Sequence, residues 1–210
     1  MTAVADLDPL ASWVEWGVAS RAIASETESG DGYVLARHAT GFLAAVVDGL
    51  GHGPDAARAA GKATETLRRH AGEPIADLVE RCHKDVKATR GVVLGLASFT
   101  VECGTMTWLS VGNVEGVLFR GDPAAAPARE SLMLRGGVVG WQLPPMRPAA
   151  LPVAAGDILI LATDGIASGF NSRAPGVLPA PAIADRILAQ WGKPSDDALV
   201  LVLRYLGGSS

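Results

Sequence analysis

The sequence predicts an α+β fold in which antiparallel sheets carry helices on their outer faces. Strand-like segments occur in groups before and after a pair of helical segments, whereas regular alternation of strands and helices would indicate a parallel sheet. Short glycine-containing turns also separate several of these strands. With 210 residues, 49% of them hydrophobic, the chain is long enough for one sizeable core. We therefore expect a single domain (residues 1–210) with its core at about 14–205 and short loose termini.

The first half of the chain contains three predicted strands and then two helices. Residues 14–20 and 33–37 are the first two strands, and the continuous apolar run 42–47 is typical of a central strand covered on both faces. A helix is expected from Pro54, because proline is favoured at the first helical position. Its small side chains predict close packing on a sheet. A second helix is expected over 75–88.

The second half returns to strands. Segments 92–101, 105–111 and 114–120 are separated by Gly104 and by Gly112-Asn113, which predicts an antiparallel meander with tight turns. Residues 143–152 contain four prolines and indicate irregular structure. The remaining expected elements are a short strand at 131–134, a strand at 157–163, a helix at 180–190 and a last strand at 197–205.

Composition excludes several classes of function. A formal net charge of −4 gives no sign of the basic face that nucleic-acid binders carry. No apolar run approaches the ~18–20 residues of a membrane-spanning helix, and residues 1–13 contain Asp6 and Asp8 but no basic region typical of a secretory signal. A disulfide between Cys82 and Cys103 is possible, but two isolated free thiols are the better interpretation of these residues. We expect a cytoplasmic protein with no nucleic-acid and no membrane partner.

The most informative pattern is an apolar strand that ends in an aspartate followed by glycine. It occurs at Asp48-Gly49 and again at Asp164-Gly165, while Asp31 lies in a glycine turn and Asp196-Asp197 precede the last strand. Mg²⁺ and Mn²⁺ prefer carboxylate and carbonyl oxygens. Aspartates at strand ends are held rigidly and face solvent, and two such ions can lower the pKa of a bridging water. The pattern indicates a two-metal site.

A simpler explanation competes with this one. Asp-Gly is also the commonest sign of a hairpin turn, which explains either pair taken alone. However, Asp48-Gly49 leads into a helix, and the residues after Asp164-Gly165 do not read as a returning strand. The residues by themselves support a metal site and a set of turns about equally.

Five motifs in order give the chain a family resemblance. Residues 48–53, Asp-Gly-Leu-Gly-His-Gly, resemble the signature of the protein phosphatase 2C superfamily in its bacterial stress-response and sporulation branch. The other four motifs are Ser29-Gly30-Asp31, Ser110-Val111-Gly112-Asn113, Ala162-Thr163-Asp164-Gly165 and Asp196-Asp197-Ala198. The resemblance implies a four-layer α-β-β-α sandwich of two antiparallel sheets flanked by helices, with metals at one edge of the sheets.

The resemblance also implies a ligand set for two Mn²⁺ or Mg²⁺ ions. Asp48 would bridge both ions, and Asp31 with the carbonyl of Gly49 would bind one of them. Asp164 and Asp196 would bind the other. Asp48 and Asp164 are thereby implied as the catalytic residues.

Three positions are less certain in role. Asp197 is the alternative ligand if the register slips by one residue from Asp196. His52 fits either a general acid or a solvated loop residue. Arg21 lies near the position of the phosphate-binding arginine of eukaryotic members, but its flanking residues differ.

The implied activity is hydrolysis of phosphoserine or phosphothreonine on STAS-domain stress-signalling proteins, either a stressosome scaffold or an anti-anti-sigma factor. The alternative is a catalytically silent domain of the same fold that acts as a binding module. A phosphatase with an aspartyl nucleophile would need a second acid at Leu50, and a serine hydrolase would need a G-x-S-x-G elbow; neither is present.

Overall fold

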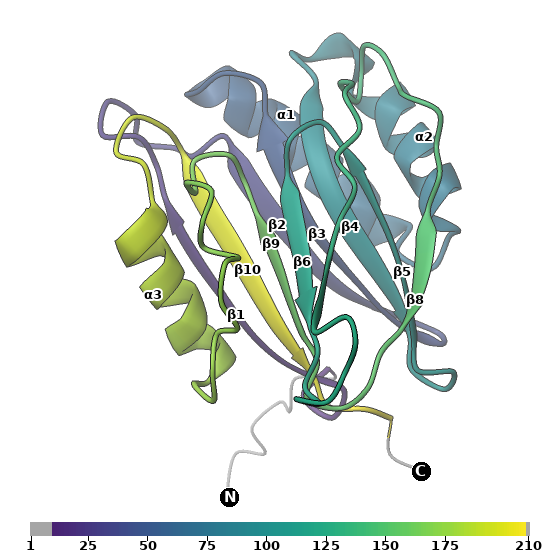
Figure 1. Cartoon of the computed structure of the whole chain (residues 1–210). Helices are drawn as coiled ribbons and strands as arrows, with labels where there is room; N and C mark the ends of the chain where they lie inside the picture. The colour runs from purple at the N-terminus through teal and green to yellow at the C-terminus, as the bar shows by residue number, and fades with distance from the viewer. Residues whose placement is uncertain (1–9, 209–210) are drawn as a thin grey trace, which may run out of the picture.

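The protein forms a four-layer sandwich, described by a computed structural model for residues 10–208 (Figure 1). Residues 1–9 and 209–210, which carry Asp6, Asp8 and parts of the predicted loose termini, lie outside the described residues. Two five-stranded antiparallel sheets pack face to face, with α1 (Pro54–Arg69) and α2 (Ile75–Asp85) on one outer face and α3 (Ala180–Trp191) on the other. The predicted α-β-β-α architecture is confirmed.

Each sheet combines strands from both halves of the chain. Sheet A contains, in spatial order, β1 (Val14–Arg21), β10 (Ala198–Tyr205), β9 (Ile158–Ala162), β6 (Glu115–Phe119) and β7 (Arg129–Ser131). Sheet B contains, in spatial order, β2 (Asp31–His38), β3 (Gly41–Gly49), β4 (Val92–Thr100), β5 (Thr105–Val111) and β8 (Ala149–Pro152). The first and last long strands are therefore neighbours in sheet A.

Three apolar layers hold the sandwich together. Between the sheets, the rings of Phe42 and Phe99 stack with centroids 4.4 Å apart, and Leu201 packs in the same cluster. A second cluster joins sheet B to α1 and α2, and a third joins sheet A to α3. Strand β3 supplies alternate side chains to the first two clusters, which is why its sequence is continuously apolar.

Small residues bring α1 close to sheet B. Ala59, Ala60 and Ala63 are buried on the face of the helix that meets the sheet. At the start of the helix, a Cβ placed on Gly49 would lie only 2.2 Å from the carbonyl oxygen of Ala56. The end of β3 and the first turn of α1 are thus fixed against each other.

Three secondary-structure predictions were wrong. Strands β4 and β5 form the expected hairpin, but β6 pairs with β9 and β7 in the other sheet, so Gly112-Asn113 carries the chain between sheets. Strand β6 can do this because Val117 packs in the cluster under α3 and Leu118 in the cluster between the sheets. The proline-rich segment contains edge strand β8, where prolines are tolerated.

The third error lies near β7, which ends at Ser131 where the predicted strand begins. The second helix also ends earlier than predicted, at Asp85, and one 3₁₀ turn (Val86–Ala88) follows it.

Cys82 and Cys103 are both free thiols. Within residues 10–208, no helix combines the length and apolar character needed to cross a bilayer.

Tight packing of α1 predicts that a larger side chain at its centre is harmful. Ala63→Leu should lower the free energy of unfolding by about 1–3 kcal/mol, because Ala63 is fully buried against sheet B. Gly61→Ala is the control on the exposed face, where an added Cβ meets nothing within 4 Å. It should stabilise by up to about 1 kcal/mol through helix propensity. Urea unfolding measures both; a stable Ala63→Leu protein would contradict the packing described.

Candidate metal centre

The predicted acidic motifs lie at one edge of the sandwich, at the end where β3 and β9 finish and β10 begins (Figure 1). In sheet B, Asp31 at the start of β2 pairs in register with Asp48 near the end of β3. In sheet A, Asp164 follows β9, and Asp196 lies two residues before β10. Because β9 and β10 are antiparallel neighbours, these last two positions come from adjacent strand ends.

Thr163 links the two sheets at this edge. Its hydroxyl donates a hydrogen bond to Asp31 Oδ2 at 2.8 Å and accepts one from the backbone N–H of Leu199 at 2.9 Å. The Thr163 side chain is buried, so these bonds are shielded from water. No role was predicted for Thr163 from the sequence, where its only signal is its place beside Asp164.

Asn113 holds the carboxylate of Asp164. Its side-chain amide donates to Asp164 Oδ2 at 2.7 Å, and Lys193 Nζ donates to the Asp164 backbone carbonyl at 2.5 Å. Asn113 lies where the chain crosses from β5 to β6, and β6 pairs with β9, the strand that Asp164 follows. The sequence predicted Asn113 only as part of a family turn, and its hydrogen bond to Asp164 was not predicted.

The two consecutive aspartates differ in their surroundings. Asp197 is 4% exposed, and both of its carboxylate oxygens accept hydrogen bonds from backbone amides, Ile23 N–H at 2.8 Å and Gly30 N–H at 2.7 Å. Asp196 is half-buried and uses one oxygen to accept the Asp197 N–H at 2.9 Å. Of the pair, Asp196 has the carboxylate that is available to an ion.

The acids repel one another. Burial, and then the charges of Asp31, Asp164, Asp196 and Asp197, raise the pKa of Asp48 from 3.8 to about 8. No described residue donates a hydrogen bond to its carboxylate. Burial also raises the pKa of Asp31 to about 7, against the lowering effect of the Thr163 hydroxyl. The pKa of Asp196 is raised, by burial and then by Asp164. Lys193 opposes the rise at Asp196, but the raised pKa values show that the negative charge of the cluster is not balanced.

The residues fit a divalent cation in donor type and in charge. Aspartate carboxylates and the Gly49 carbonyl are the hard oxygen ligands that Mg²⁺ and Mn²⁺ prefer. Among residues 10–208, no three His, Cys, Asp or Glu side chains are close enough to form a ready-made metal cage. Repulsion between uncompensated carboxylates opposes such convergence, and a bound cation would remove it.

The other polar candidates lie around this cluster. His52 Nδ1 contacts Glu26 Oε1 at 2.9 Å, and the His52 side chain is mostly exposed. Arg21 donates to the carbonyl of Lys193 at 2.8 Å, so its guanidinium is directed along the sheet A side of the edge. Neither contact reaches an acid of the cluster.

Fold and acidic edge together define a class: this is the architecture of the protein phosphatase 2C-type (PPM-type) phosphatases. The chain belongs to the family of stage II sporulation protein E (SpoIIE), whose sequence model matches residues 38–206. The predicted membership of the superfamily's bacterial stress-response and sporulation branch is confirmed.

Individual proteins of known structure or activity are also similar to this chain. The phosphoserine phosphatase RsbX of Bacillus subtilis (strain 168) is 29% identical over 89 residues, which span 42% of this chain and 45% of RsbX. A solved structure of RsbX in complex with magnesium superimposes with a TM-score of 0.80 at 20% identity, covering 92% of this chain and 96% of its own, and shows a shared fold.

A second solved structure is described as "The bacterial stressosome: a modular system that has been adapted to control secondary messenger signaling". It is 27% identical to this chain and has a TM-score of 0.82, and the match covers 91% of this chain and 99% of the other. The two solved structures thus share their fold with 91% and 92% of this chain.

The raised pKa of Asp48 predicts a pH dependence of stability without metal. A carboxyl with a higher pKa in the folded chain binds more protons when folded, so between pH 3.8 and about 8 its contribution to stability falls as the pH rises. In EDTA, Asp48→Asn should therefore be more stable than the wild type at pH 8, by at least about 1 kcal/mol. Thermal unfolding across this range measures the difference.

The control is Glu80→Gln, which removes an exposed carboxylate from α2. Its unfolding should follow the wild-type pH profile. A wild-type protein that gains as much stability as Asp48→Asn between pH 5 and pH 8 would contradict the repulsion described, because the ordinary value is 3.8 and the raised one about 8.

Proposed function

We propose that this protein is a metal-dependent serine/threonine protein phosphatase. The observation that carries the proposal is the meeting of carboxylates from both sheets at one edge, where Asp31 and Asp48 have pKa values raised to about 7 and about 8. Such a cluster has the donors and the excess negative charge that a pair of Mn²⁺ or Mg²⁺ ions requires. The magnesium complex of RsbX supports the same choice of cofactor.

In this proposal the ligands divide between the sheets. Asp48, Asp31 and the Gly49 carbonyl from sheet B, together with Asp164 and Asp196 from the sheet A side, would hold the two ions. When bound, two such ions supply a water of lowered pKa and neutralise the phosphoryl oxygens.

The chain's own groups orient this ligand set. Thr163 directs Asp31 Oδ2, and Asn113 directs Asp164 Oδ2, through hydrogen bonds of 2.8 and 2.7 Å. Hydrogen bonds of this kind fix the direction in which a ligating carboxylate presents its free lone pairs. No protein nucleophile is needed, since water attacks the phosphorus and the serine or threonine oxygen leaves.

The proposed substrate is phosphoserine or phosphothreonine on a STAS-domain protein of a stress-signalling pathway in the cytoplasm, a stressosome scaffold or an anti-anti-sigma factor. Similarity to a phosphoserine phosphatase and to a solved structure whose description begins "The bacterial stressosome" supports this choice. Incubation with phosphorylated STAS proteins from the same genome, with and without Mn²⁺, tests it directly. Release of phosphate from none of them would reject these substrates.

Hydrolysis of p-nitrophenyl phosphate tests the activity apart from the substrate. The wild type should be active with Mn²⁺ and inactive in EDTA, and Asp48→Asn and Asp164→Asn should each lose at least about 100-fold in kcat/KM, since each removes a proposed ion ligand. Glu80→Gln serves as the control and should stay fully active. A wild type that is folded but inactive with Mn²⁺, Mg²⁺ and every STAS substrate would favour the silent binding module.

The role of Asn113 makes a separate prediction. Asn113→Ala frees the Asp164 carboxylate to rotate and should weaken Mn²⁺ binding about 10–100-fold, as expected for loss of a group that orients a ligand. Asn171→Ala is the matched control, because that amide donates to Glu115 at 3.2 Å instead of to a proposed ligand. Isothermal titration calorimetry with Mn²⁺ compares them. Equal affinities for the two variants would contradict the assignment.

A further inference from the structure

Asp197 connects the metal edge to the segment between β1 and β2. Its Oδ1 accepts the Ile23 N–H and its Oδ2 accepts the Gly30 N–H, so one buried carboxylate binds this segment at both of its ends. The partners are 174 and 167 residues away in sequence. Hydrogen bonds from amides to an ionised carboxylate are stronger than bonds between neutral groups. Asp197 is therefore a cross-link between distant parts of the chain.

The segment it binds has little regular structure of its own. Residues 22–30 contain no helix or strand. Within them, the Glu26 N–H donates to the Ile23 carbonyl at 2.9 Å, a single local turn. The two bonds to Asp197 hold this segment near its two ends, and the 2.9 Å contact between Glu26 and His52 holds it between them.

The end of the segment leads straight to the proposed ligands. Gly30 precedes Asp31, and its carbonyl accepts the Gly49 N–H at 2.9 Å. A hydrogen-bonded path thus runs from Asp197 in sheet A through Gly30 to Asp31 and Gly49 in sheet B. The Thr163 hydroxyl bond to Asp31 makes a second link across the same edge.

Two glycines allow this close approach. A Cβ on Gly30 would lie 3.0 Å from Asp197 Oδ2 and 2.9 Å from the Ala56 side chain. A Cβ on Gly165 would lie 1.8 Å from the backbone oxygen of Asp197. Larger residues at either position would displace Asp197 from the place where its carboxylate meets the segment.

We propose that Asp197 is a positioning residue: its carboxylate holds residues 22–30 against sheet A and so sets where Asp31 and Gly49 stand relative to Asp164 and Asp196. This inference rests on the proposed function for the identity of the ligands, but the cross-link itself does not. Asp197 acts through backbone amides and leaves metal binding to its neighbour Asp196.

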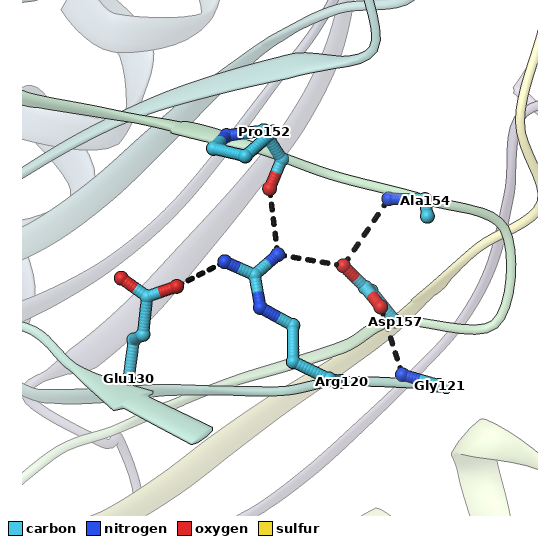
Figure 2. Close-up of polar contacts among 6 residues, drawn as sticks. All are labelled: Arg120, Gly121, Glu130, Pro152, Ala154 and Asp157. Atoms are coloured by element: carbon cyan, nitrogen blue, oxygen red, sulfur yellow. Dashed lines mark hydrogen bonds and ion pairs between the residues drawn. The ribbon is translucent and has the colours of Figure 1, made fainter. Parts of the chain in front are cut away.

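A second buried aspartate in the chain provides a matched control for the cross-link made by Asp197. Asp157 is 2% exposed and also binds two backbone amides, Gly121 N–H at 2.8 Å and Ala154 N–H at 3.2 Å, together with Arg120 at 3.0 Å (Figure 2). It lies directly before β9, whereas Asp164 lies beyond the other end of that strand. Substitutions at Asp157 therefore remove a similar structural cross-link far from the proposed ligands.

The test compares Asp197→Ala and Asp197→Asn with Asp157→Ala and Asp157→Asn in the full chain. Hydrogen–deuterium exchange of the metal-free proteins reports on residues 22–30, and calorimetry with Mn²⁺ reports on the proposed site. We expect Asp197→Ala to speed exchange in residues 22–30 at least about tenfold and to weaken Mn²⁺ binding by about 10–100-fold. Asp197→Asn keeps one acceptor oxygen and should fall between Asp197→Ala and the wild type.

The variants at Asp157 should lower the melting temperature but leave the affinity for Mn²⁺ and the exchange of residues 22–30 within about twofold of the wild type. The intermediate value for Asp197→Asn separates positioning from simple loss of charge, which would affect both Asp197 variants equally. If Asp197→Ala does not fold, Asp197→Asn against Asp157→Asn decides the question.

Two results would overturn the proposal: unchanged exchange of residues 22–30 in the Asp197 variants, or equal effects of the Asp157 and Asp197 variants on Mn²⁺ affinity. If the wild type binds no Mn²⁺, the proposed function fails, and the exchange result alone decides whether Asp197 holds the segment.

Discussion

Electrostatic repulsion among carboxylates at one edge of two packed sheets is the constraint on which the candidate site depends. Asp48 is half-buried, receives no hydrogen bond from a described residue and has a pKa raised to about 8. A folded protein that retains such a group without a counter-charge gives up stability for it. This loss is most simply explained if the negative charge is balanced by a cation during function.

The sandwich supports that arrangement from three sides. The apolar layer between the sheets fixes their separation, and the close contact of Gly49 with Ala56 fixes the end of β3 against α1. Polar links then cross the edge itself, through Thr163 and through Asp197. The proposed ligands of sheet A and sheet B are therefore held in place by apolar packing and by hydrogen bonds across the edge.

Much of this could be predicted from the sequence, because the signals were local. The apolar run in β3 predicted a strand with two buried faces, and the Asp-Gly pairs after apolar strands predicted acids at strand ends. The pairing of strands that are distant in the sequence was harder to predict. Nothing near Gly112-Asn113 distinguishes a hairpin turn from a crossing between sheets, since the choice depends on where β6 finds its partners. The prolines around β8 hid its strand character, because its place at the edge of the sheet depends on its pairing with the distant strand β5.

The roles of individual polar residues could be recognised only from the three-dimensional structure. The side chains of Thr163, Asn113 and Asp197 bond partners at least 36 residues away, so no local pattern predicts these hydrogen bonds. The adjacent acids Asp196 and Asp197 look equivalent in the sequence, and only burial and the two amide donors separate them. Spacing can locate a group of acids, but the division into ligands and supports follows from three-dimensional contacts.

The central claim is that carboxylates from both sheets jointly hold divalent cations. Anomalous diffraction from a crystal soaked in manganese chloride tests it most directly. We expect manganese peaks at this edge, coordinated by Asp31 and Asp48 on one side and by Asp164 and Asp196 on the other. A map in which these four side chains stay apart with no manganese peak among them would contradict it.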